Sequence, residues 1–307
     1  MPGCCTGGVS SQQEPPPRPF RWSLSARADG GPDRIGGLGE GAEPVELWYL
    51  DELVRCTALV LARSAAADLV LVGRSLDSVY DLLTGAYERT SRADGTALRR
   101  LPLSGLSPWT IDGTNRRRLR EHLAAVGLEP SALARRGRPV ALVDIVHGGG
   151  TFDALHGELA RWIEESRQPW PVIRRRLRYV GVTIQGSTSP KHLRWQQSEP
   201  SWRWVRTLPS GHVVNVSMPF EVWSWFGNGH QPKIGPAFPP ARWFDGDAAG
   251  VPRHERLPDA LAHARALVEA GRGRAVRDQL VRVMAADPGF AAREVRALAS
   301  ELRHRAG

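Results

Sequence analysis

Short apolar runs that alternate with amphipathic segments constrain the fold of this chain most strongly. The stretches DLVLVG (68–73), VALVDIV (140–146) and RLRYVGVTIQG (176–186) are predicted to be strands, and the first has the short continuous apolar run of a strand that is buried on both faces. Between the last two, FDALHGELARWIEES (152–166) has its apolar residues at helical spacing. Alternating strands and helices of this kind predict an α/β fold, with an open parallel sheet and helices on its faces.

The other elements have weaker signals. RRLPLSG (99–105) is predicted to be a strand, and Pro102 argues against a central place for it in the sheet. HVVNVSM (212–218) alternates like a strand, and Asp77 is placed to cap the helix after the first strand. Further helices are predicted at 43–63, 116–127 and, in two or three short pieces, 257–305.

Composition divides the chain into four segments. Residues 1–42 are rich in Gly and Pro and are predicted to be a mobile N-terminal segment. Residues 43–186 carry the regular pattern and form the predicted α/β core. Residues 187–250 form an irregular, Trp-rich cap or extension, which holds six of the eleven tryptophans of the chain. Residues 251–307 are a C-terminal helical segment.

The chain is strongly basic, with a formal net charge of +9, and its only lysines are Lys191 and Lys233. A basic surface attracts phosphate groups, whether on nucleic acid or on a small metabolite. The arginines are scattered rather than gathered in one block, which disfavours nucleic acid without excluding it. No apolar run reaches the roughly 20 residues of a membrane span, no export signal is visible, and three cysteines make no disulfide framework. We therefore expect a cytoplasmic protein with no membrane partner.

The loop that follows the strand at 140–146 has the composition of a phosphate site. The acid Asp144 lies near the end of the strand, where it can bind sugar hydroxyls or a hydrated metal ion. A triple glycine then opens the next helix, where backbone amides can bind an anion. A carboxylate beside such amides suits a sugar phosphate. The predicted phosphate- and ribose-binding residues are Asp144, Gly148, Gly149, Gly150 and Thr151.

Three known motifs fit this loop poorly. The Gly-x-Gly-x-x-Gly signature of dinucleotide-binding folds is absent, and the P-loop requires a lysine that is missing here. His-Gly-Gly-Gly also occurs in the oxyanion loop of lipase-like esterases, but no Gly-x-Ser-x-Gly elbow follows it. A metal site built from His147, Asp153 and His156 is not expected, because only the last two share a helical face.

The loop resembles the signature of type I phosphoribosyltransferases, and the resemblance extends over roughly residues 45–186 of the chain. In that family a buried strand ends in two acids, followed by two apolar residues and a Thr/Gly-rich turn. Here Val140 to Val143 match the strand, Asp144 the second acid, Ile145 and Val146 the apolar pair, and residues 147–151 the phosphate loop. Val143 stands where the family has its first acid.

The resemblance implies a role for each matching residue. Asp144 would bind the ribose hydroxyls of phosphoribosyl diphosphate, and the amides of residues 148–151 its 5-phosphate. His147 stands where some members carry an aspartate that acts as a base, so Asp144 and His147 are the candidate catalytic residues; an exposed turn histidine is the alternative. The family also implies Mg²⁺ as a cofactor.

A second loop, LVGRSLDS (71–78), follows the first strand, where the family binds diphosphate. Gly73, Arg74 and Ser75 are the candidate diphosphate-binding residues, since a guanidinium matches phosphate oxygens. The alternative is a simple strand-to-helix turn with Arg74 in solvent. Residues 104–118 stand where the family has a mobile lid, from which the arginines at 116–118 could reach diphosphate, but the surface of a helix accounts better for these three arginines.

The resemblance predicts transfer of ribosyl 5-phosphate from phosphoribosyl diphosphate to a nitrogen nucleophile, with release of diphosphate. The acceptor is not identified by any pattern in the sequence. Two alternatives stay open. One is a non-catalytic regulator that binds phosphoribosyl diphosphate or a nucleotide, which Val143 favours. The other is an Arg/Trp-rich module that binds protein or nucleic acid.

Overall fold

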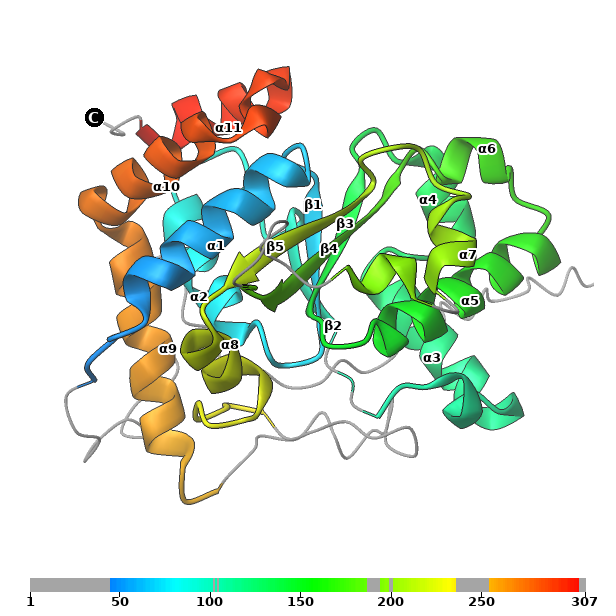
Figure 1. Ribbon diagram of the computed structural model, residues 1–307, viewed down its shortest axis with the longest axis horizontal. Helices are drawn as coiled ribbons and strands as arrows, with labels where there is room; N and C mark the ends of the chain where they lie inside the picture. Colours follow the sequence, from blue (N-terminus) through cyan, green and yellow to red (C-terminus); the bar gives the residue numbers. More distant parts are fainter. Residues whose placement is uncertain are drawn as a thin grey trace, which may run out of the picture.

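The fold is built on one parallel β-sheet, seen in a computed structural model that describes residues 45–101, 103, 105–186, 194–198, 201–235 and 254–303. The sheet has five strands in the order β2-β1-β3-β4-β5, and every neighbouring pair is parallel (Figure 1). The strands are β1 (Asp68–Val72), β2 (Leu98–Leu101), β3 (Val140–Ile145), β4 (Leu177–Ile184) and β5 (Val213–Met218). The prediction of an α/β fold with an open parallel sheet is confirmed.

Helices cover both faces of the sheet, because alternate side chains of each strand enter different apolar clusters. In β3, Ala141 and Val143 join one cluster, and Val140 and Leu142 join the other. The first cluster lies under α1 (Leu50–Arg63), α2 (Asp77–Tyr87) and α8 (Phe220–Gly227). The second lies under α3 (Gly113–Ala125), α4 (Pro130–Arg135), α5 (Gly150–Glu165) and α6 (Trp170–Ile173).

Three C-terminal helices form a further layer over α1 and α2 (Figure 1). They are α9 (Leu257–Arg272), α10 (Arg274–Ala286) and α11 (Arg293–Arg303). Gly85 of α2 and Gly271 of α9 allow two helices to approach closely, since a Cβ at Gly85 would lie 1.9 Å from the carbonyl oxygen of Val268. The predicted C-terminal helical segment therefore shares its apolar core with the sheet rather than standing apart from it.

The sheet extends past the boundary predicted at residue 186. β5 pairs with β4 from Tyr179–Val213 to Ile184–Met218, so part of the predicted Trp-rich extension belongs to the core. β5 lies at the edge of the sheet and carries the polar residues Asn215 and Ser217, which weakens its apolar signal in the sequence. The predicted mobile segment 1–42 lies outside the described residues.

Several local predictions are corrected. The spacing of Trp202 and Trp204, at i and i+2, favours a strand with one ring buried, but both residues lie in the short helix α7 (Ser201–Val205). Asp77 is the first residue of α2 rather than a cap before it, and its carboxylate accepts two hydrogen bonds of 2.7 Å from Arg100 of β2. β2 ends at Leu101 and lies at the edge of the sheet, as Pro102 indicated. No helix in the described part of the chain is both long and apolar enough to cross a membrane.

The strand order locates the place where a ligand can enter. The chain moves from β1 outward to β2, and then crosses back to β3 on the other side of β1. The connections on the two sides therefore diverge beyond the carboxyl ends of β1 and β3. A crevice forms at such a switch point in open α/β sheets, and ligands bind there.

Candidate functional site

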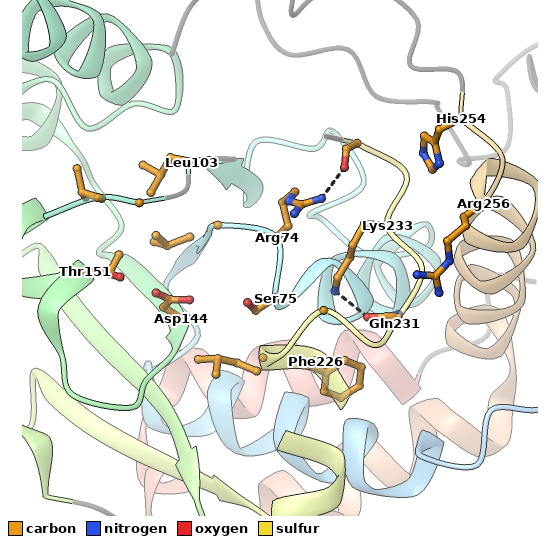
Figure 2. Close-up of a pocket in the computed structure, with 18 residues that line it drawn as sticks. Arg74, Ser75, Leu103, Asp144, Thr151, Phe226, Gln231, Lys233, His254 and Arg256 are labelled. Carbon is orange, nitrogen blue, oxygen red and sulfur yellow. Dashed lines mark hydrogen bonds between the residues drawn. The ribbon is translucent and has the colours of Figure 1, made fainter. Parts of the chain in front are cut away.

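The two loops singled out in the sequence meet at this switch point and line one cavity of about 640 Å³. The loop after β1 contributes Gly73, Arg74 and Ser75, and the end of β3 with the start of α5 contributes Asp144 and Thr151. In Figure 2, Asp144 and Thr151 lie at one side of the cavity, with Ser75 and Arg74 between them and the residues of later segments. Those later residues are Phe226, Gln231, Lys233, His254 and Arg256.

A second cavity of about 490 Å³ adjoins the first. It is lined by the whole loop from His147 to Thr151 and also by Leu106, Ser107 and Trp109. Four residues line both cavities: Leu106, Asp144, Ile145 and Thr151. The glycine loop and the β1 loop therefore face two adjoining spaces, and one carboxylate lies where these spaces meet.

Asp144 is buried in an unusual state for an acid. Only 8% of its surface is exposed, and no cation among the described residues forms an ion pair with it. Burial raises the pKa of the Asp144 carboxyl well above its usual range, and a hydrogen bond from the backbone of Ile145 opposes this shift. A buried carboxylate without a charged partner destabilises the fold, and carboxyls of this kind are frequent at functional sites.

Different structural features account for the three glycines of the loop. Gly149 has φ of +88°, and a Cβ there would lie 2.6 Å from Cε3 of Trp195 and 3.0 Å from Oγ of Ser201. Trp195 is fully buried, so Gly149 is required by packing as well as by its backbone conformation. Gly148 and Gly150 are exposed, and a Cβ on either would meet none of the described atoms within 4 Å. These two glycines leave open space at the loop that is predicted to bind phosphate.

The amides predicted to bind phosphate lie at the start of α5. Gly149 precedes the helix, and Gly150 and Thr151 are its first two residues. The first amides of a helix lack partners within it, so they are available to an anion. Asp153 lies one turn into the helix and accepts hydrogen bonds of 2.7 Å from Ser201 and Trp204. These contacts fix the position of α5 against α7.

His147 is exposed in the same loop and lines the smaller cavity. Its ring centroid lies 6.3 Å from that of Trp223. This position is compatible both with a base and with an exposed turn histidine, so its catalytic role stays a prediction.

Arg74 lies in the wall of the larger cavity and is half-buried, rather than in solvent. Its guanidinium donates a hydrogen bond of 2.7 Å to the carbonyl oxygen of Gly235 (Figure 2). Burial lowers the pKa of Arg74, and the carboxylate of Asp77 opposes this effect. Gly73 precedes it with φ of +71°, a conformation that favours glycine and turns the loop away from the strand.

The opposite wall of this cavity was not predicted from the sequence. Lys233 and Gln231 come from the irregular segment after α8, and Arg256 immediately precedes α9. Ile234 is buried against α9 and anchors the segment that carries Lys233. The sequence holds one usable signal, since Lys233 is one of only two lysines in a chain whose other basic residues are arginines.

Other candidate residues lie away from the cavities. Arg116 pairs with Glu158 of α5 at 3.1 Å, which supports a surface role for that arginine. His156 is buried, hydrogen-bonded to the Tyr179 hydroxyl at 2.9 Å and stacked on Trp204, and burial lowers its pKa to about 4. In the described ranges no group of three or more His, Cys, Asp or Glu residues is arranged to hold a metal ion.

Comparison with known proteins identifies no relative. No protein-family model, no curated protein and no solved structure matches this chain. The functional conclusion therefore depends on the residues of the two cavities.

Proposed function

We propose that the two adjoining cavities bind phosphoribosyl diphosphate, and that the protein transfers its ribosyl 5-phosphate to a nitrogen nucleophile. The position of Asp144 carries this proposal. This buried carboxyl lies between a cavity lined by a glycine loop and a cavity lined by cationic side chains. Phosphoribosyl diphosphate has the matching order of groups, with ribose hydroxyls between a phosphate and a diphosphate.

Each part of the ligand has a chemical counterpart in the cavities. The amides of Gly150 and Thr151 and the Thr151 hydroxyl suit the 5-phosphate, because a helix N-terminus attracts an anion. Asp144 suits the ribose hydroxyls, which would replace the water that burial removes from this carboxyl. Arg74 and the turn at Gly73 suit the diphosphate.

The proposed reaction exchanges one bond at C1 of the ribose for another. The bond from C1 to the diphosphate oxygen breaks, and diphosphate leaves with the electron pair. The nitrogen of the acceptor supplies the electron pair of the new C1–N bond and loses a proton, for which His147 is the candidate base. Arg74 stabilises the negative charge that develops on diphosphate, while the cavities hold both ends of the ribosyl phosphate in place.

The magnesium ion that the resemblance implies has few protein ligands available. Among the described residues, Asp144 is the only carboxylate that lines either cavity. Val143 belongs to the apolar cluster on the other face of the sheet, so the position of the missing first acid does not face the cavities. Asp144 and the oxygens of the substrate would therefore hold Mg²⁺, which supplies positive charge to diphosphate when bound.

A non-catalytic protein that binds the same ligand as a signal is the second candidate. The burial of Val143 favours it, because one carboxylate is sufficient to bind ribose hydroxyls but provides a poor metal site. Both candidates require the same binding site. Release of diphosphate in the presence of an acceptor separates the two.

The first test is calorimetric titration of phosphoribosyl diphosphate with Mg²⁺ into the full chain. The wild type should bind, and Asp144→Ala should lose about tenfold to a hundredfold in affinity, the usual worth of hydrogen bonds to a charged group. Asp278→Ala, on the outer helix α10, is the control for loss of a carboxylate and should bind as the wild type does. If the wild type does not bind, or if Asp144→Ala binds equally well, the proposal is wrong.

A further inference from the structure

Three cationic side chains line the larger cavity, and in the described part of the chain no acid forms an ion pair with any of them. They are Arg74, Lys233 and Arg256. Two of them bind neutral oxygens: Arg74 donates to the carbonyl of Gly235 at 2.7 Å, and Arg256 to that of His230 at 3.5 Å. The positive charge on this side of the cavity is therefore available to an anionic ligand.

Lys233 is held in place by a chain of two hydrogen bonds through the buried side chain of Gln231. Its ammonium donates a hydrogen bond of 2.9 Å to the side-chain oxygen of Gln231, and the Gln231 amide donates to the hydroxyl of Ser78 in α2. Gln231 is only 4% exposed. An ammonium has three N–H donors, and the structure gives one of them a partner among the described residues. Lys233 is itself half-buried, so its remaining donors can reach a ligand in the cavity.

The position of these cations differs from that of the glycine loop. Lys233 and Arg256 face the cavity from the side opposite Asp144 and Thr151. Arg74 lies between these two sides (Figure 2). A ligand that spans from the glycine loop past Asp144 therefore reaches the cations with its far end. Guanidinium and ammonium groups are the usual protein partners of phosphate oxygens.

We propose that Lys233, together with Arg74 and Arg256, binds the diphosphate group directly and supplies most of the charge that neutralises it. This inference rests on the proposed function and adds a residue from the segment after α8 to the site. It also explains how a cavity with a single carboxylate among its described residues can hold diphosphate. Side-chain cations would provide the positive charge, so binding should depend only weakly on Mg²⁺.

The surroundings of Lys233 give this site a pH dependence. Burial lowers the pKa of Lys233 to about 8; Arg74 and Arg100 lower it further, while Asp77 and Asp81 oppose them. His254 and Arg256 line the same cavity. Above pH 8 the free ammonium loses its proton, so the affinity of the wild type for diphosphate should fall, at most about tenfold for each pH unit. Arginine at this position would stay charged throughout.

The experiment is calorimetric titration of inorganic diphosphate into the full chain, with EDTA or with Mg²⁺. The wild type should bind in EDTA, within about tenfold of its affinity in Mg²⁺. Lys233→Gln should lose about tenfold to a hundredfold in affinity, because a hydrogen bond to a charged group is removed. Arg282→Gln, an exposed position of α10, removes the same charge outside the cavity and should bind normally.

Lys233→Arg provides a second readout that loss of folding cannot imitate. This variant should bind diphosphate with an affinity that changes less between about pH 7 and 9.5 than that of the wild type. The Lys233 proposal is overturned if Lys233→Gln binds as the wild type does, or if the wild type binds diphosphate only with Mg²⁺. Those outcomes leave the proposed function standing when phosphoribosyl diphosphate still binds. If diphosphate binds in EDTA but phosphoribosyl diphosphate does not bind, the cationic site stands and the proposed function fails.

Discussion

Replacement of Gly149 by alanine should destabilise the protein strongly, although the change adds a single methyl group. The backbone at Gly149 has φ of +88°, where a residue with a Cβ costs about 1 to 2 kcal/mol. The new Cβ would lie 2.6 Å from Cε3 of the buried Trp195, and such overpacking typically costs about 1 to 3 kcal/mol. The free energy of unfolding should therefore fall by about 2 to 5 kcal/mol.

The two neighbouring glycines supply matched controls for this change. Neither Gly148 nor Gly150 has a positive φ, and a Cβ at either position meets none of the described atoms within 4 Å. Gly150 is the first residue of α5, where alanine favours the helix by up to about 1 kcal/mol. The free energy of unfolding of Gly148→Ala and of Gly150→Ala should be close to that of the wild type or higher.

The assay is urea unfolding followed by circular dichroism. The free energies of unfolding of the three variants are compared on the condition that their m-values, the slopes against urea concentration, are equal. A loss of stability confined to Gly149→Ala supports the packing of the loop against Trp195. If Gly149→Ala is as stable as Gly148→Ala, or if all three lose the same amount, the position of the loop in the structure is wrong.

The remaining predictions concern the ligand and two buried titratable groups. Gly148→Ala and Gly150→Ala should weaken binding of ribose 5-phosphate, measured by calorimetry, because both residues line the smaller cavity and a methyl group there would take up open space; unchanged binding would mean that the 5-phosphate does not bind at the glycine loop. The raised pKa of Asp144 means that the native state binds more protons than the unfolded chain, so the free energy of unfolding should fall as pH rises from the ordinary aspartate range through the raised value. Asp144→Asn should remove this fall in urea titrations at several pH values, and an identical pH profile would contradict it. For His156, whose pKa burial lowers to about 4, the sign is reversed: the unfolded chain binds more protons, and about 3 kcal/mol of stability should be lost as pH falls from 6.5 to 4. His156→Gln should lack that part of the acid sensitivity. If the wild type and His156→Gln lose the same stability between pH 6.5 and 4, the histidine is not buried in its neutral form.

The regular part of the fold was predictable because its strands carry strong local signals. β1, β3 and β4 are central strands, and central parallel strands are apolar on both faces. β5 is an edge strand with polar residues, so the predicted boundary at residue 186 separated it from its sheet. The helix α7 was missed because Trp202 and Trp204 occur in a stretch too short for helical spacing to become visible.

The candidate site was predictable to the extent that its residues follow strands. Asp144 and Arg74 lie at the ends of neighbouring strands. The carboxyl ends of neighbouring parallel strands lie at the same edge of the sheet, so these two residues were expected to line one site. Lys233 and Arg256 come from irregular chain before α9, and their place depends on the burial of Ile234 against that helix. The packing reason for Gly149 was equally hidden, because it depends on the buried ring of the distant Trp195.

The proposed function requires that one ligand spans the two cavities that meet at Asp144. The most direct measurement is the affinity of ribose 5-phosphate for protein that is saturated with inorganic diphosphate, determined by calorimetry with phosphoribosyl diphosphate as a competitor. The two fragments should bind together, each with nearly its own affinity, and phosphoribosyl diphosphate should displace both. Fragments that compete for a single site, or fragments that phosphoribosyl diphosphate cannot displace, would contradict it.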